Sequence, residues 1–155
     1  MLDLFDELAA LIAALEAEPV DYALCGGLAM AVHAVPRATI DIDLMIQATD
    51  LPIVMRIANR LGYTFEAAPM RFRGGQVEIR RISKIDPVSN DTLTLDLLLV
   101  TPVTESAWNS RQAIEWEGGT IRVVSRSGLI ELKSLRGSGQ DLDDIALLRE
   151  DGDEA

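Results

Sequence analysis

Two aspartates separated by one residue give the clearest chemical signal in the sequence. Asp41 and Asp43 alternate with apolar residues in the run Ile-Asp-Ile-Asp-Leu-Met-Ile, residues 40–46. This alternation predicts a strand whose two carboxylates point to the same side, about 6 to 7 Å apart. Like charges held so close repel unless a cation lies between them, and carboxylate oxygens suit Mg²⁺. The pair therefore predicts a site for a divalent metal ion.

A glycine pair before these aspartates predicts a phosphate-binding turn. Gly26 and Gly27 follow the apolar run 20–25 and precede a short helical segment. Glycine lets the backbone turn tightly, and the unpaired N–H groups and the dipole of a helix N-terminus attract phosphate. A phosphate cradle followed by metal-binding carboxylates is what transfer chemistry on a nucleoside triphosphate requires.

A third carboxylate, Asp96, lies in a strand predicted over residues 93–100. Apolar residues surround it on both faces of this strand. A buried and isolated charge costs several kcal/mol unless it is paired or bound to a metal ion. Two interpretations remain open: Asp96 is a metal ligand, or it forms a salt bridge with one of the arginines.

These motifs together resemble the nucleotidyltransferase superfamily (DNA polymerase beta-like), and most closely its branch of AbiEii-type toxins and their small stand-alone relatives. The segment Gly-Gly-x-Ala…His-x-x-Pro-Arg-x-Thr-x-Asp-x-Asp, residues 26–43, carries the resemblance. It implies that Asp41, Asp43 and Asp96 are catalytic and bind Mg²⁺ or Mn²⁺. The residues that it assigns to the nucleotide are Gly26, Gly27, Arg37 and Lys133.

The C-terminal part of the chain carries more of the same resemblance. Lys133 and Arg136 precede aspartates at 141 and 144, as in the C-terminal signature of AbiEii-type proteins. The signature implies that Lys133 reaches the triphosphate or the active-site carboxylates, while Asp141 and Asp144 brace Arg136 and the following loop. Without the earlier motifs, Lys133 would be a solvated helix residue and the aspartates favourable charges at a helix N-terminus.

The resemblance implies transfer of a nucleoside monophosphate from a nucleoside triphosphate, ATP among them, to an acceptor hydroxyl. The acceptor stays open between an RNA 3′ end such as that of tRNA, a protein and a small molecule such as an antibiotic. Leu28 stands where many members of the superfamily have Ser or Thr, which favours the alternative of an inactive nucleotide-binding module. A second alternative is an interaction protein of the toxin–antitoxin type. A homodimer is one way for so small a transferase to complete its acceptor site.

Basic side chains concentrate around a flexible glycine pair in residues 71–84. Two interpretations remain: they form the solvated face of an edge strand, or they meet the phosphates of an acceptor such as RNA. The cluster consists of Arg71, Arg73, Arg80, Arg81 and Lys84.

The order of apolar segments predicts a small α/β (α+β) domain with a mixed sheet, helices chiefly on one face and a nucleotidyltransferase-like fold. We expect one domain over residues 1–149 and a frayed acidic tail over 150–155. The expected strands are 20–25, 40–46, 63–67, 76–84 and 93–100, with a hairpin at 115–123. The expected helices are 2–17, a short one after the glycine pair, 50–61, one capped by Ser127, and 141–149.

Composition limits the surroundings of the protein. Its 155 residues are 48% hydrophobic, which favours a folded chain. No apolar run approaches the roughly 20 residues of a membrane span, and the acidic N-terminus does not resemble a secretory signal. The single cysteine cannot form an internal disulfide, which favours the cytoplasm. A net charge of −11 disfavours broad binding of nucleic acid.

Overall fold

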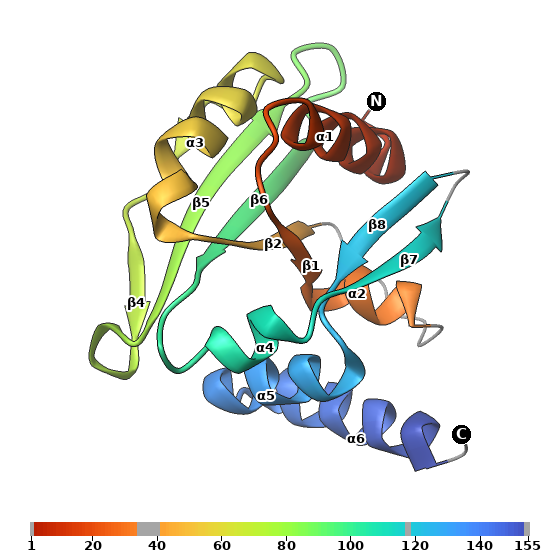
Figure 1. Cartoon of the computed structure of the whole chain (residues 1–155). Helices are drawn as coiled ribbons and strands as arrows, with labels where there is room; N and C mark the ends of the chain where they lie inside the picture. Colours follow the sequence, from red (N-terminus) through yellow and green to blue (C-terminus); the bar gives the residue numbers. More distant parts are fainter. Residues whose placement is uncertain (1, 34–40, 117–118, 154–155) are drawn as a thin grey trace.

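A mixed β-sheet forms the centre of the molecule (Figure 1). The computed structural model describes residues 2–33, 41–116 and 119–153, the last three by their backbone alone. Within these residues the sheet has eight strands in the order β3-β5-β6-β2-β1-β8-β7, and β4 also pairs with β5. The strands are β1 (Ala23–Cys25), β2 (Asp41–Ile46), β3 (Phe65–Glu66), β4 (Met70–Phe72), β5 (Val77–Ile85), β6 (Thr92–Leu99), β7 (Gln112–Trp116) and β8 (Gly119–Val123).

Two groups of helices accompany this sheet. Figure 1 shows α1 and α3 together above, while α4, α5 and α6 gather below. The helices are α1 (Leu4–Ala17), α2 (Gly26–Val32), α3 (Leu51–Arg60), α4 (Glu105–Asn109), α5 (Arg126–Arg136) and α6 (Gly139–Asp153). The predicted fold class, a small mixed α/β domain, is confirmed. Among the described residues, every helix is too short or too polar to span a bilayer.

The central strands β2 and β6 run parallel and turn one apolar face into the core. Ile42 and Leu44 pair in register with Leu95 and Leu97, and all four are fully buried with Leu11 of α1. The alternation that buries Ile42 and Leu44 forces Asp41 and Asp43 onto the opposite face. The hydrophobic pattern thus fixes the face of the sheet on which the aspartates lie.

Several element boundaries differ from the sequence expectation. The segment expected as a loop at 71–75 overlaps strand β4, and helix α4 was not predicted because five residues give too little periodicity. Helix α5 is capped by Ser125, whose hydroxyl accepts from the N–H of Gly128, so the predicted cap at Ser127 is wrong. Helix α6 begins before residue 141 and continues past 149.

Candidate active site

The register of four neighbouring strands brings four chemically active side chains into one row. Cys25 of β1 pairs with Asp43 of β2, Asp43 pairs with Asp96 of β6, and Asp96 pairs with Arg81 of β5. Directly paired residues point to the same face of a sheet. Asp41 shares this face because it lies two residues before Asp43. The three aspartates therefore line one cleft.

Asp96 is held in this row by a two-pronged salt bridge. Nε of Arg81 lies 2.8 Å from one carboxylate oxygen of Asp96, and Nη2 lies 2.9 Å from the other. Asp96 is only 9% exposed, so this pairing offsets much of the cost of burying its charge. The arginine partner that the sequence left open for Asp96 is thus Arg81. Each carboxylate oxygen of Asp96 keeps a further lone pair for another donor.

Asp43 has a strongly perturbed carboxyl group. Burial raises the pKa of its carboxyl to about 7, assisted by the charges of Asp96 and Asp41, while Arg136 and Lys133 act in the opposite direction. The raised pKa means that the nearby cations do not fully offset the clustered negative charge. This position in the cleft favours a proton or an additional cation.

The turn between β1 and α2 needs a glycine because it touches Asp43. Gly26 has a φ of +69°, a region that side chains rarely adopt, and a Cβ placed on it would lie 2.7 Å from Cγ of Asp43. The N-cap residue of α2, Cys25, makes no capping hydrogen bond with its side chain, and the helix begins at Gly26 and Gly27. The neighbouring Leu28 is buried in the core and does not line the cleft. The turn therefore presents backbone, without a hydroxyl, beside the aspartates.

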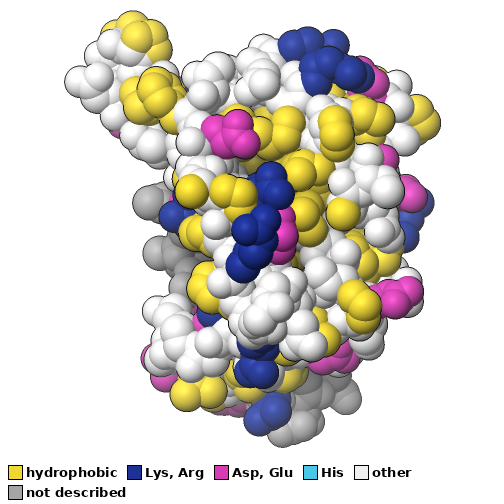
Figure 2. All heavy atoms as spheres, turned by 90° about the vertical axis from the view of Figure 1, so that its left-hand side faces the viewer, with side chains coloured by type: hydrophobic (Ala, Val, Ile, Leu, Met, Phe, Trp, Pro, Cys, Tyr) yellow, Lys and Arg dark blue, Asp and Glu magenta, His cyan; other side chains and the backbone are white. Residues whose placement is uncertain are grey.

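The cleft lies between the sheet and helix α5 and has a volume of about 190 Å³. One part of its lining is charged and holds the aspartate row, and another part is apolar. Figure 2 shows this mixture on the side of the molecule that carries β4 and β5, where hydrophobic side chains surround basic side chains lying against acidic ones. The apolar lining includes Phe72, Val77, Ile79, Leu98, Leu132 and Leu135.

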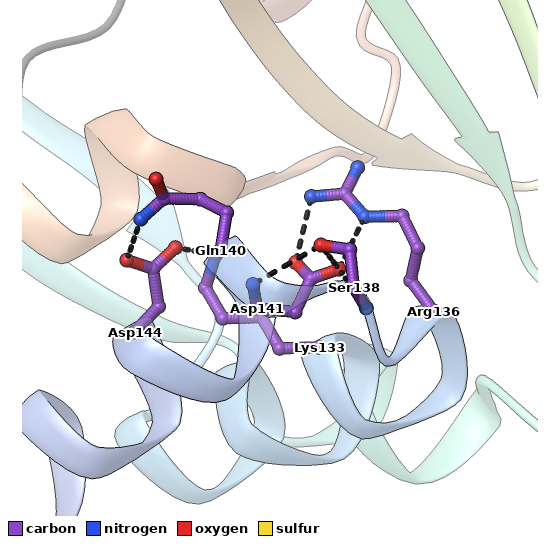
Figure 3. Close-up of polar contacts among 6 residues, drawn as sticks. All are labelled: Lys133, Arg136, Ser138, Gln140, Asp141 and Asp144. Carbon is purple, nitrogen blue, oxygen red and sulfur yellow. Dashed lines mark hydrogen bonds and ion pairs between the residues drawn. The ribbon is translucent and has the colours of Figure 1, made fainter.

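Lys133 of α5 lines the cleft, and its ammonium group is bound by Asp144 of α6. Its Nζ lies 2.9 Å from Oδ2 of Asp144, and the side chains are 7% and 1% exposed (Figure 3). Nε2 of Gln140 donates to the other oxygen of Asp144 at 2.9 Å. Asp144 thus contacts the segment expected as a loop through Gln140, while its cation partner is Lys133 and Arg136 is bound by Asp141.

Arg136 lies at the end of α5 and is fixed by Asp141. Nε and Nη2 of Arg136 each lie 2.8 Å from an oxygen of Asp141, which also accepts from the hydroxyl of Ser138 (Figure 3). Burial alone would raise the pKa of Asp141, but hydrogen bonds from Arg136 and Ser138 lower it to about 2. The Asp141 side chain is fully buried while that of Arg136 is 55% exposed. Asp141 thus braces Arg136 as expected, and the guanidinium remains accessible.

The aspartates supply the chemistry of a magnesium site without forming a closed cage. Asp41 and Asp43 offer hard oxygen donors on one side of β2, and the raised pKa of Asp43 is consistent with a cation between them. Within the described ranges, no three Asp, Glu, His or Cys side chains are close enough together to hold a metal ion. The pair fits an ion that takes its remaining ligands from phosphates and water. Asp96 as a third ligand stays a prediction.

The remaining predicted site residues are Arg37 and the basic cluster of residues 71–84. Arg37 lies outside the described residues. The basic cluster of residues 71–84 is spread along β4 and β5, where its side chains bind local partners: Arg71 and Arg80 bind Glu78, and Lys84 binds Glu7. Of this cluster, Arg81 lines the cleft. Sequence reasoning did not single it out, because only the register of β5 on β6 distinguishes it from its neighbours.

Two solved structures of antibiotic-modifying or resistance proteins are similar to this chain in fold. The lincosamide antibiotic adenylyltransferase LnuA, solved with lincomycin bound, is 15% identical with a TM-score of 0.60, over 93% of this chain and 95% of that one. The antibiotic-resistance factor ANT(2'')-Ia is 13% identical with a TM-score of 0.59, over 92% and 80%. At such identities the likeness shows a shared fold. No curated protein sequence matches the chain.

A family model extends the comparison from fold to sequence. The model of aminoglycoside-2''-adenylyltransferase matches residues 7–148, which include the glycine turn, the aspartates at 41, 43 and 96, and the cleft-lining cations Lys133 and Arg136. The chain therefore belongs to the aminoglycoside-2''-adenylyltransferase family, within the nucleotidyltransferase superfamily.

Proposed function

We propose that this chain transfers a nucleoside monophosphate, most simply the adenylyl group of ATP, to a hydroxyl of a small-molecule acceptor. The observation that carries the proposal is the strand register that sets Asp43 beside Asp96, with the Gly26 turn against Asp43 in the same cleft. Membership of an adenylyltransferase family supports the same reaction class.

The polar groups on the sheet side would position the nucleotide. Asp41 and Asp43 would hold Mg²⁺, or Mn²⁺, and a bound metal ion supplies positive charge to the triphosphate and to the leaving pyrophosphate. Gly26 and Gly27 offer the uncapped backbone N–H groups of α2 to phosphate oxygens. Arg37, which precedes β2 in the chain, is assigned to the nucleotide by the resemblance alone.

The two basic residues of α5 that line the cleft, Lys133 and Arg136, differ in what they can reach. Lys133 is buried against Asp144, so its charge acts on the cleft from a fixed position. Arg136 is exposed and held in orientation by Asp141, and a braced guanidinium suits a phosphate with two oxygens to offer. We therefore assign direct phosphate contact to Arg136 and a positioning role to Lys133. This assignment reverses the roles that the sequence suggested.

The reaction needs a group that takes a proton from the acceptor. In the proposed step, the hydroxyl oxygen of the acceptor bonds to the α-phosphorus, and the bond from that phosphorus to the oxygen bridging to the β-phosphate breaks. Pyrophosphate leaves with the electron pair, and Asp96 accepts the hydroxyl proton. Arg81 binds both oxygens of Asp96 and so fixes the orientation of the carboxylate.

The relatives favour an antibiotic-like acceptor over RNA or protein. ANT(2'')-Ia has been solved in complex with adenylyl-2''-tobramycin, and LnuA with lincomycin. The AbiEii-type resemblance, a toxin–antitoxin partner, a homodimer and a cytoplasmic location stay predictions. An inactive nucleotide-binding module is the main alternative, since Leu28 leaves the glycine turn without a hydroxyl.

Labelled nucleotides test the reaction directly. The protein is incubated with α-³²P-labelled ATP, Mg²⁺ and a panel of hydroxyl-bearing antibiotics, and the products are separated by chromatography. Wild type should label an acceptor, Asp43→Asn should lower the rate at least a hundredfold, and Asp143→Asn, an exposed change on α6, should match wild type. Binding of ATP with no labelled product from any nucleotide or acceptor would favour the inactive module. Equal labelling by Asp43→Asn would refute the proposed site.

A further inference from the structure

We propose that the acceptor half of the cleft selects an uncharged or weakly charged molecule with an apolar body, and rejects polycations. This inference rests on the proposed function, because it names the acceptor class for the same site. It departs from the expectation for aminoglycosides, whose several ammonium groups need unpaired carboxylates.

An apolar wall continues directly from the aspartate row. Ile79 of β5 pairs with Leu98 of β6, one pair beyond Arg81 and Asp96 on the same face. Phe72 of β4, 43% exposed, extends the wall. On the facing side, α5 contributes Leu132 and Leu135. This part of the cleft is therefore lined by apolar side chains, which favours an apolar occupant.

The position of this wall assigns it to the acceptor. The glycine turn lies beyond β2 on the β1 side, whereas Ile79 and Leu98 lie on the β5–β6 side, past Asp96. An attacking hydroxyl must approach the α-phosphorus opposite the leaving pyrophosphate, roughly in line with it. If phosphates lie at the glycine turn, the acceptor must therefore come from the side of Asp96 and the apolar wall.

The charges on this side oppose a polycation. Asp96 is the carboxylate beside the wall, and Arg81 already neutralises its charge with one bond to each oxygen. The side chain of Arg81 is 42% exposed and places a positive charge at the edge of the wall. Glu78 alternates to the other face of β5 and binds Arg71 and Arg80. An ammonium group entering here would lose water and meet a like charge.

A fluorescent probe tests the wall without requiring transfer activity. The neutral fluorophore N-phenyl-1-naphthylamine is titrated into wild type, Ile79→Glu and Phe72→Ser, with Ile85→Glu as the matched control at the exposed far end of the same strand. We expect at least fivefold weaker binding for Ile79→Glu and Phe72→Ser and no change for Ile85→Glu. Because Phe72 is exposed, its variant should stay folded, which thermal melting checks. Equal probe binding by all variants would overturn the inference.

A competition between acceptors tests the charge preference. Wild type receives labelled ATP with either tobramycin or the neutral 4-nitrophenyl β-D-glucopyranoside, and displacement of the probe by each compound is measured in parallel. The inference expects displacement by the neutral compound at least tenfold more effective than by tobramycin. Preferred binding or labelling of tobramycin would overturn it. Probe displacement by the neutral compound without labelling of any acceptor would count against the proposed reaction and leave the apolar subsite standing.

Discussion

Replacing Asp43 by asparagine should stabilise the metal-free protein and remove its response to Mg²⁺. The pKa of Asp43 rises from 3.8 to about 7 in the fold. Each unit of pKa is worth about 1.36 kcal/mol, so at pH 8 the ionised carboxylate costs up to about 4 kcal/mol of folding free energy. Solvent screening at this partly exposed side chain reduces the expected gain for Asp43→Asn to about 1 to 3 kcal/mol.

The pH dependence of this gain has a definite sign. Between pH 4 and pH 7 the folded wild type binds more protons than the unfolded chain, because the folded pKa is the higher one. Its free energy of unfolding therefore falls as the pH rises through this window. The amide that replaces the carboxyl in Asp43→Asn cannot ionise, so the advantage of the variant should be small at pH 4 and complete above pH 7.

Urea unfolding followed by tryptophan fluorescence, with EDTA at pH 4.5 and at pH 8, measures this difference. Adding Mg²⁺ at a hundred times its dissociation constant should stabilise wild type by about 2.7 kcal/mol and leave Asp43→Asn nearly unchanged. Asp143→Asn is the control, since this exposed aspartate on α6 lies outside the cleft. A gain for Asp43→Asn that does not grow with pH, or an undiminished response to Mg²⁺, would refute the electrostatic reasoning.

Four further variants probe the surroundings of the aspartates. Gly26→Ala should lower the free energy of unfolding by about 2 kcal/mol or more, because its Cβ meets Asp43 at a positive φ; a thermal melt unchanged from wild type would contradict this. Lys133→Met should cost about 3 kcal/mol, since it removes the ammonium that pairs with the buried Asp144, whereas Arg136→Met should cost under about 1.5 kcal/mol but weaken ATP binding more. Unfolding and ATP titrations of both variants check this order, and the reverse order in ATP binding would sink our assignment of the two cations. Asp141 has a pKa of about 2 in the fold, so it should contribute about 2 kcal/mol above pH 4 that is lost as the pH falls towards 2. Acid titrations of wild type and Asp141→Asn should therefore converge at low pH, and parallel curves would argue against the pairing with Arg136.

Local sequence patterns predicted a large part of the candidate site. The alternation around Asp41 and Asp43 is a property of a strand with one buried face, so it indicates their common side without knowledge of the fold. The glycine pair likewise marks a turn that other residues would strain. Apolar spacing around Lys133 predicts a helix, whereas Arg136, expected in the loop after it, is the last residue of α5. These features depend on residues close together in the chain.

Contacts between residues far apart in the chain could not be predicted from local sequence patterns. Which of five basic residues binds Asp96 depends on the register of β5 against β6, and a shift of one residue would send Arg81 to the other face. The exchange of expected roles between Lys133 and Arg136 depends on how α6 packs on α5. The short helix α4 and strand β4 lacked a period long enough to be recognised.

The sequence by itself determined that a pair of carboxylates would stand beside a glycine turn on a mixed sheet, because strand alternation and backbone freedom are local properties. Tertiary structure alone decided which charges neutralise one another and that an apolar wall adjoins Asp96. Pairing between β5 and β6 and the packing of α5 over the sheet set those distances, and electrostatic and hydrophobic energies depend on distance and burial in the folded chain.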